Sequence, residues 1–413
     1  MRFAYQFRPA GVFCDNPGRE ETELRKAFSL ATILGVAASL LAMPVRAQSV
    51  PGVTKDQITI GSFGSLTGPT YLYGKLTMNG VDAVFAKVNE AGGINGRKLV
   101  LVREDDRCDP ATAIAAVKKL VFSENVFAII GGGCSNAALG ARPEIVKDEI
   151  PTVIFASVAD EITDPVAKYI YTTMTTASTE SRAQVDYAIE HGAKKIAIVA
   201  QHDAWGQSRY KPLMAALAKH NITPVIDLEM TVDDNDATVQ ALKISQAGAD
   251  AIIMELYAKP GAVLVRALNK LGQDPMLIGE TGIADPVAFT KQVDIPGATD
   301  KFATPAAVRY TTSSPEMKDW TAQIKKMFPS DDLSVFNLMG IGSAQVLVAA
   351  LQKAGPDLTR EKLLDALAHI NVTTDTYAGP IVCDDPVSHQ CNQHVAWMKA
   401  SGDHAEMLSD KTQ

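Results

Sequence analysis

Three apolar, strand-like segments end in short loops of glycine and small residues that are suited to holding a small anion. The first loop is 61–69, followed by Tyr71 and Tyr73; the second is 131–136, and the third is 155–159. Glycines permit tight turns and close approach of the backbone to a ligand. Free backbone N–H groups and the positive end of a helix dipole hold a carboxylate where a loop leads into a helix. The loops therefore predict a binding site at strand ends, where doubly wound sheets bind ligands.

Each loop also has a simpler explanation. The first is equally a plain turn between strand and helix with exposed tyrosines. In the second, which contains Cys134 and Ser135, the serine hydroxyl serves as a helix N-cap, as a donor to a carboxylate, or as both. The third is a loop of small residues selected for compactness.

The sequence lacks the patterns that would place catalytic or cofactor chemistry in these loops. The glycines of 131–133 do not follow the GxGxxG spacing of a dinucleotide site, and no GxxxxGK[ST] phosphate loop occurs. There is no GxSxG nucleophile elbow, no HxxxH pair and no CxxC. We therefore expect a protein that is not an enzyme and that uses no cofactor and no metal.

The elements that must position these loops alternate between short apolar strands and amphipathic helices, as in βαβ units with parallel sheets. The units are too many for one sheet, so we predict an α/β fold with two Rossmann-like, doubly wound lobes. No long linker separates the lobes, which predicts short crossings that act as a hinge. The expected strands are 58–60, 98–103, 126–130, 152–155, 195–200, 225–228, 251–254 and 276–278, and the expected helices are 78–88, 110–121, 137–147, 180–191, 206–220, 237–247, 261–271 and 334–353.

Bulk composition agrees with a two-domain globular protein. The chain has 413 residues, of which 46% are hydrophobic and 21% charged, with a net charge of -8. A negative chain of this kind lacks the basic face that a nucleic-acid binder needs.

The N-terminal region predicts export. An apolar run at 27–43 follows two basic residues, and a small-x-small pattern ends at Ala47, which is typical of a signal peptide cleaved there. The alternative is a membrane anchor, but the run is short for a membrane span. Residues 1–23 are too long and too mixed in charge for the start of a signal peptide, so we hypothesise that translation begins at Leu24. The mature protein is expected in the periplasm.

Cysteine usage fits an oxidising compartment. Cys14 lies in the discarded leader, and four cysteines remain in the mature chain: Cys108, Cys134, Cys383 and Cys391. An even number in an exported chain predicts two disulfides, for which there are three possible pairings.

An ordered set of motifs resembles the leucine/isoleucine/valine-binding proteins of branched-chain amino acid ABC transporters. The likeness covers residues 56–400, and its motifs are Leu66-Thr67-Gly68-Pro69, Tyr73-Gly74, Asn89-Glu90-Ala91-Gly92-Gly93-Ile94-Asn95-Gly96, Asp105-Asp106, Cys108-Asp109-Pro110 and Ile130-Gly131. The resemblance implies a type I periplasmic-binding-protein fold joined by three crossings. After the leader at 1–47, it assigns 52–175 with 306–378 to the first lobe and 176–305 with 379–405 to the second. It also pairs Cys108 with Cys134, which leaves Cys383 and Cys391 as a second disulfide.

The resemblance further implies how a ligand is held. Ser135, after Cys134 at the start of its helix, would bind the α-carboxylate. Ala156, through its carbonyl, and Val158 would meet the head group of an amino acid. The aromatic walls would be Tyr73, Trp205 and Tyr257.

Two positions depart from the family pattern. Val158 stands where a hydroxyl residue is common, and Ser157 beside it is placed to compensate. The ammonium-binding glutamate of the family aligns with Thr281, whereas Glu280 lies one residue earlier. A one-residue shift either restores the ion pair or points the carboxylate elsewhere, and an unpaired ammonium in a dry cleft is costly.

The resulting prediction is a periplasmic ligand-binding subunit of an ABC importer that captures an amino acid, branched-chain or similar, between two lobes. The alternative ligand is an aromatic or aliphatic carboxylate without an amino group. An exported enzyme and a ligand sensor are the remaining alternatives. The expected partners are the small carboxylate and an inner-membrane ABC permease, with no nucleic acid, and the protein is expected to be a monomer.

Overall fold

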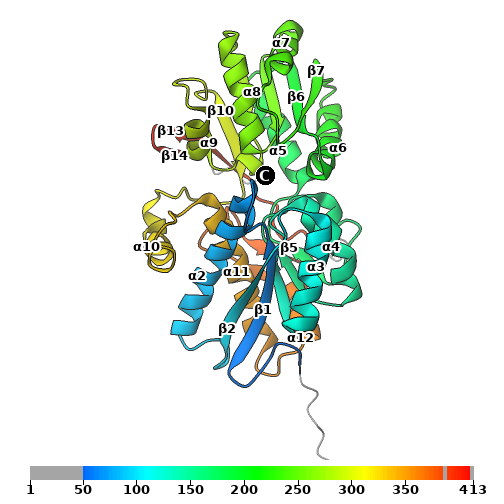
Figure 1. Ribbon diagram of the computed structural model, residues 1–413, viewed down its shortest axis with the longest axis vertical. Helices are drawn as coiled ribbons and strands as arrows, with labels where there is room; N and C mark the ends of the chain where they lie inside the picture. Colours follow the sequence, from blue (N-terminus) through cyan, green and yellow to red (C-terminus); the bar gives the residue numbers. More distant parts are fainter. Residues whose placement is uncertain (1–49, 385–387, 410–413) are drawn as a thin grey trace, which may run out of the picture. The chain divides into compact units, whose positions relative to one another are not determined.

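Two β-sheets flanked by helices organise the chain (Figure 1). The computed structural model describes residues 50–384 and 388–409, so the predicted leader, with Cys14, the hypothetical start at Leu24 and cleavage after Ala47, lies outside the described residues. In both sheets most strands are parallel and helices flank them, which confirms the predicted α/β class. Each predicted strand and helix is present, with ends that differ by a few residues.

The first sheet is entirely parallel and has the order β2-β1-β3-β4-β5. Its strands are β1 (Gln57–Gly64), β2 (Lys98–Asp105), β3 (Ala128–Gly131), β4 (Thr152–Ile154) and β5 (Ile170–Thr172). Its helices are α2 (Thr77–Glu90), α3 (Pro110–Lys118), α4 (Ser135–Lys147), α10 (Lys318–Met327), α11 (Val335–Ala354) and α12 (Arg360–Ala368). A small antiparallel pair, β11 (Asn371–Val372) and β12 (Ile381–Val382), lies close to this lobe.

The second sheet has the order β14-β13-β10-β9-β8-β6-β7, with antiparallel strands only at the β13 and β14 edge. Its strands are β6 (Ile196–Gln201), β7 (Ile226–Met230), β8 (Ala251–Glu255), β9 (Met276–Ile278), β10 (Phe302–Ala306), β13 (Ala396–Ser401) and β14 (His404–Ser409). Its helices are α5 (Ala177–Glu190), α6 (Ala204–Lys219), α7 (Thr238–Ala247), α8 (Ala258–Lys270) and α9 (Pro286–Val293).

Local signals in the sequence explain where several helices begin and end. Asp109 caps α3 by accepting a hydrogen bond of 2.7 Å from the backbone N–H of Thr112, and Pro110 occupies the first helical position. Gly272 follows α8 with a φ of +64°, a left-handed conformation that favours glycine and stops a helix. These ends place the loops that follow β2 and precede β9.

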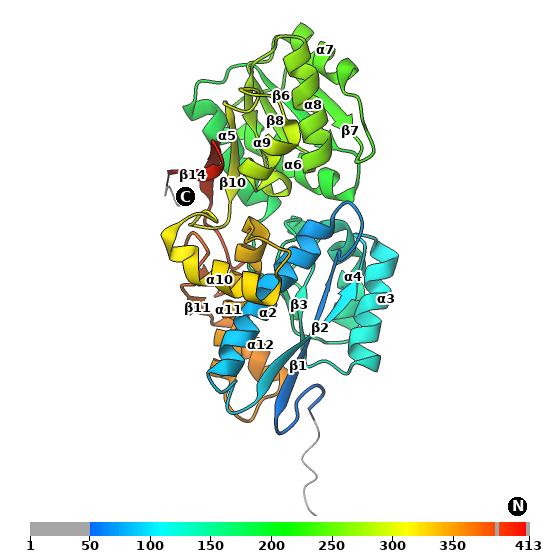
Figure 2. The ribbon, with the colours of Figure 1, turned by 60° about the vertical axis from the view of Figure 1, so that its left-hand side comes forward.

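The core of the first lobe is centred on α11, which packs against α2 and α12 (Figure 2). A Cβ on Gly340 would stand 1.9 Å from the carbonyl oxygen of Thr77, so only glycine permits this approach to α2. Among the described residues, α11 is the helix with the length and apolar composition of a membrane span. Its burial within the lobe identifies it as a core helix of this protein.

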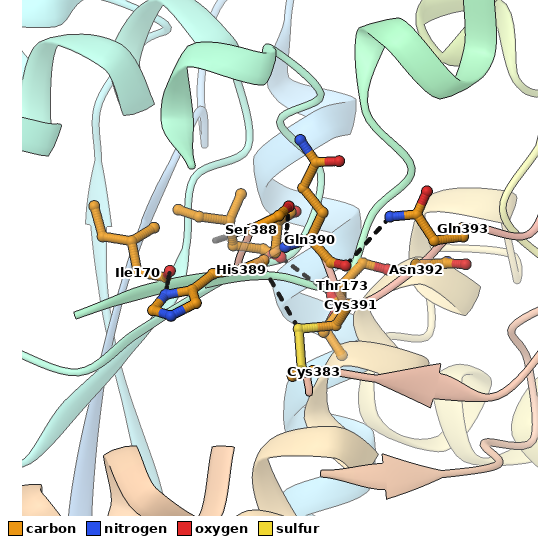
Figure 3. Close-up of a disulfide and its surroundings, with 12 residues drawn as sticks. Ile170, Thr173, Cys383, Ser388, His389, Gln390, Cys391, Asn392 and Gln393 are labelled. Carbon is orange, nitrogen blue, oxygen red and sulfur yellow. Dashed lines mark hydrogen bonds between the residues drawn. A yellow bond between two sulfur atoms is a disulfide. The ribbon is translucent and has the colours of Figure 1, made fainter. Parts of the chain in front are cut away.

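The two sheets are connected by chain segments that hydrogen-bond to one another. Next to β5, the Thr172 N–H donates to the carbonyl of His389, and the Cys391 N–H donates to the carbonyl of Thr172, both at 2.9 Å. The side-chain amide of Asn392 donates to the carbonyl of Thr173, and the disulfide between Cys383 and Cys391 anchors the same segment (Figure 3). The segment that leaves the first sheet after β5 is therefore bonded to the later segment that leads to β13.

Candidate functional site

A small cavity lies at the carboxyl ends of strands from both sheets, which is where doubly wound folds bind ligands. The first lobe contributes residues that follow β1, β3 and β4, and the second contributes residues that follow β6, β8 and β9. Its lining consists of Tyr73, Gly133, Cys134, Ser135, Ala156, Val158, Trp205, Tyr257, Thr281 and Gly282.

Most of the predicted site residues meet at this cavity. Ser157 and Glu280 are the two that do not line it. Gly133 belongs to the predicted loop 131–136, whereas Gly282 lines the cavity although the sequence did not single it out, because a glycine contributes backbone atoms and carries no side-chain signal. The predicted residues that do line it are Tyr73, Cys134, Ser135, Ala156, Val158, Trp205, Tyr257 and Thr281.

Ser135 presents a hydroxyl donor to the cavity. Its Oγ accepts hydrogen bonds from the backbone N–H groups of Val158 at 3.2 Å and Ala159 at 3.3 Å. These bonds use the lone pairs of the hydroxyl and fix its position, so its proton is left to be donated elsewhere. Since Ser135 lines the cavity and is almost fully buried, a ligand oxygen is a suitable acceptor.

The start of α4 adds backbone donors beside this hydroxyl. Cys134 is the N-cap residue, and its side chain makes no capping hydrogen bond. The first bond of this turn runs from the Ala138 N–H to the Cys134 carbonyl at 2.9 Å, so the preceding N–H groups lack intrahelical acceptors. A disulfide joins Cys134 to Cys108, as predicted, and fixes this helix start to the loop after β2.

Tyr73 is positioned by a π-helical turn, Leu72–Leu76, that precedes α2. A Cβ on Gly74 would lie 2.2 Å from the carbonyl oxygen of Ser65, so glycine is required for this turn to pack on the loop after β1. The Tyr73 hydroxyl donates to the Gly282 carbonyl at 2.8 Å and thereby links the two lobes across the cavity. Burial raises the pKa of Tyr73, and the nearby Glu280 raises it further.

The remaining aromatic side chains form a continuous wall. Trp205 and Tyr257 stack with ring centroids 4.4 Å apart and planes 13° apart, and Tyr73 lies 5.9 Å from Tyr257 at a tilt of 45°. Stacked and tilted ring pairs contribute attraction beyond their buried area. Burial, together with Asp203, raises the pKa of Tyr257, so its hydroxyl stays protonated. The wall is therefore apolar, with neutral hydroxyl groups at its edge.

Glu280 lies behind this wall and is fully buried. Its carboxylate accepts a hydrogen bond from the Gly282 N–H and lies 3.9 Å from Arg209 Nε. Burial raises the pKa of Glu280 well above its usual value, and Arg209 opposes part of that rise. None of the described residues that line the cavity carries a carboxyl group or a basic side chain.

Ser157 turns its hydroxyl away from the cavity. Its Oγ donates to the Gly132 carbonyl at 2.7 Å, and its backbone N–H donates to the same carbonyl at 3.0 Å. Both bonds hold the loop after β4 against the loop after β3. The hydroxyl proton of Ser157 is therefore donated to the backbone, while the neighbouring residues Ala156 and Val158 line the cavity.

The chemistry that this site offers is binding. A hydroxyl and helix-start N–H groups lie on one side, and an apolar aromatic wall lies on the other. Within residues 50–384 and 388–409, no group of histidine, cysteine, aspartate and glutamate side chains is arranged to hold a metal ion. A few polar donors opposite an apolar wall are typical of a small-molecule binding site.

Comparison with known proteins places this arrangement in a family. A family model described as periplasmic binding protein matches residues 57–405. The chain is 24% identical over 300 residues to "Leu/Ile/Val-binding protein homolog 3" of Brucella melitensis biotype 1. The aligned region covers 72% of this chain and 79% of that relative.

Solved structures with the same fold hold different ligands. The branched-chain amino acid transporter substrate binding protein LivJ from Streptococcus pneumoniae, in complex with isoleucine, has a TM-score of 0.74 and 19% identity over 86% of this chain and 99% of its own. An ABC transporter solute binding protein from R. palustris, in complex with 4-hydroxybenzoate, has a TM-score of 0.72 and 22% identity over 86% of this chain and 96% of its own. Since the family model spans most of the sequence, this chain belongs to the periplasmic binding protein family, whose members bind solutes and are not enzymes.

Proposed function

We propose that this chain is the solute-binding subunit of an ABC importer and that it captures a small carboxylate with an apolar or aromatic body and no ammonium group. The ligand lies between the two lobes, with its carboxylate at the start of α4 and its body against the aromatic wall. The observation that carries the proposal is the free Ser135 proton beside the uncapped helix start in a cavity without charged side chains.

The carboxylate end follows from the donors of the first lobe. A hydroxyl and successive backbone N–H groups at a helix start suit a negative group. Hydrogen bonds to a charged acceptor contribute about 1.5–3 kcal/mol each, more than bonds between neutral groups. The lining offers no positive side chain to compete for this role.

The absence of an ammonium follows from the lining of the second lobe. An ammonium in a dry cleft needs a carboxylate or several acceptors. Glu280, the acid nearest in sequence to the lining, accepts from the Gly282 N–H and is held near Arg209. The second-lobe face of the cavity therefore consists of Thr281, Gly282 and aromatic rings, which suit an apolar ligand body.

A branched-chain amino acid is the second candidate. It is favoured by the curated relatives, which are named Leu/Ile/Val-binding proteins and are identical to this chain at about a quarter of the aligned residues. Such a ligand would need Glu280, or the Tyr73 and Tyr257 hydroxyls, to receive its ammonium.

The setting of this function is the periplasm. The predicted signal peptide and the family both favour export, and the disulfides suit an oxidising compartment. Because lining residues come from both lobes, a ligand binds best to the conformation in which the lobes approach each other. It thereby shifts the population towards the form that the permease would recognise.

A thermal-shift screen of the mature chain, residues 48–413, tests the proposal. The probes are pairs that differ only in the α-amino group, 4-methylpentanoate against leucine and 3-phenylpropanoate against phenylalanine, together with benzoate and 4-hydroxybenzoate. A ligand at 100 times its dissociation constant stabilises the folded state by about 2.7 kcal/mol, an easily measured shift. Stabilisation by the members without nitrogen supports the proposal, stabilisation only by the amino acids supports the second candidate, and no response to any probe contradicts both.

A further inference from the structure

Four charged side chains are buried together behind the second-lobe wall of the cavity: Arg209, Glu180, Glu255 and Glu280, which we call the buried charge cluster. Arg209, Glu255 and Glu280 are 0% exposed and Glu180 is 2% exposed. Arg209 Nη2 lies 3.0 Å from Glu180 Oε2, and Arg209 Nε donates to Glu255 and lies 3.9 Å from Glu280. Charged residues are almost never fully buried unless they are paired, so the cluster requires an explanation.

Arg209 and Glu255 each lie next to one of the aromatic lining residues. Trp205 precedes Arg209 by one helical turn in α6, and the guanidinium lies 5.6 Å from the indole ring centroid, within cation–π range. Tyr257 lies two residues after Glu255, the last residue of β8. The cluster therefore backs the aromatic wall.

The two glutamates that remain are bonded to the rest of the second-lobe lining. The Thr281 hydroxyl donates to Glu180, and the Gly282 N–H donates to Glu280. Trp205, Thr281 and Gly282 are thus linked to Arg209, either directly or through a glutamate of the cluster.

The charge balance of the cluster is unequal. Three carboxyl groups share one guanidinium in a site without water access, and their mutual repulsion disfavours full ionisation. The pKa of Arg209 is raised by its carboxylate neighbours although burial alone would lower it, and burial raises the pKa of Glu280. Arg209 is the only base in this cluster, so its removal would leave Glu280 without a cationic partner.

We propose that Arg209 is a specificity-determining residue, because it retains Glu280 in the buried charge cluster and so keeps a carboxylate out of the cavity that would otherwise receive a ligand ammonium. The inference rests on the proposed function, since it concerns the same cavity. It explains why Oε2 of Glu280, one residue from the lining, is directed towards an arginine and a backbone N–H. The buried charge cluster behind the aromatic wall, and not a lining side chain, then determines whether ligands with an amino group are accepted.

Isothermal titration calorimetry with matched probes tests this role. The quantity measured is the dissociation constant for leucine divided by that for 4-methylpentanoate, repeated with phenylalanine and 3-phenylpropanoate. In the natural protein we expect this ratio to be at least about 100, since an unpaired buried ammonium is costly. In Arg209→Met/Glu255→Gln, which removes the base and one acid together, the ratio should fall at least about tenfold as Glu280 becomes available. Adding Glu280→Gln should restore it.

Two further variants separate this role from general damage. Lys211→Met removes an exposed charge from the same helix and should leave the ratio at its natural value. Glu280→Gln alone should change the ratio less than about threefold, since a carboxylate that does not meet the ligand contributes little to its affinity. This variant keeps the test decisive if the double variant does not fold, and a rise of more than about tenfold in its ratio would overturn the proposal.

The outcomes distinguish the inference from the proposed function. If 4-methylpentanoate is strongly preferred but the ratio is unchanged in the folded double variant, the role of Arg209 is wrong and the proposed function stands. If the natural protein binds leucine as tightly as 4-methylpentanoate, the ligand class is wrong and the inference falls with it. If neither member of either pair binds, both are wrong.

Discussion

Replacing Ser135 with alanine tests the carboxylate site directly, and the size of its effect can be worked out from the contacts. The hydroxyl proton would donate to a charged oxygen of the ligand, an interaction that contributes about 1.5–3 kcal/mol. Its loss should weaken binding roughly 10- to 150-fold, because each 1.4 kcal/mol is about a factor of ten. The N–H groups of Val158 and Ala159 also lose their acceptor. Since both bonds are long, we expect about 2 kcal/mol of lost folding stability in total.

The two effects are separated by measuring affinity and stability on the same samples. Calorimetry with 4-methylpentanoate and 3-phenylpropanoate gives the dissociation constants, and urea unfolding gives the free energy of unfolding. Thr152→Val is the control, because this buried hydroxyl donates to the Ile150 carbonyl at 3.0 Å near the start of β4, away from the lining. The control should lose about 1 kcal/mol of stability without losing affinity. The reasoning is refuted if Ser135→Ala loses stability as expected but its affinity changes less than about threefold.

Three other predictions concern groups around the cavity. Asp106 is buried, and burial raises its pKa to about 7, so between pH 4 and 7 the folded protein holds a proton that the unfolded chain has lost. The free energy of unfolding should therefore fall by up to about 4 kcal/mol as the pH rises from 4 to 7. Urea unfolding of Asp106→Asn should show a smaller decrease over the same pH range. Replacing Cys108 and Cys134 with serine opens a disulfide spanning 26 residues, which should cost about 3.5 kcal/mol by loop-closure entropy and weaken carboxylate binding; unchanged affinity in calorimetry would contradict the role given to the α4 start. Gly74→Ala should destabilise the protein by about 1–3 kcal/mol and displace Tyr73, because the new Cβ would stand 2.2 Å from a carbonyl oxygen; near-natural thermal stability would show that the turn adapts.

The alternation of strands and helices was predictable because buried parallel strands read as continuous apolar runs. Elements without such a pattern were not predicted. β10 (Phe302–Ala306) contains a proline, β5 (Ile170–Thr172) has only three residues, and β13 and β14 form an antiparallel edge near the end of the chain. Short or edge strands are fixed by pairing with distant strands, which leaves little trace in local sequence.

The first-lobe side of the site was predictable for a local reason. Glycines, a serine and a helix start occur together at 131–136, so the pattern already contains the donors and their geometry. The buried charge cluster was not predictable, since its members lie far apart at 180, 209, 255 and 280. A partial signal existed in Glu255, an acid that ends an otherwise apolar strand, but its partner could not be inferred from spacing.

This difference bears on how ligand class is determined in such a fold. Isoleucine and 4-hydroxybenzoate, the ligands of the two similar structures, share a carboxylate and differ in whether an ammonium accompanies it. A carboxylate site built from a contiguous loop and helix start keeps its chemistry as long as that segment is retained. Under our proposal, acceptance or rejection of an ammonium depends on whether one glutamate reaches the cavity, and in this chain Glu280 lies 3.9 Å from Arg209 of a different helix. A change in ligand class therefore requires no change in the lining itself, and the affinity ratio for matched ligands should respond to substitutions behind the wall.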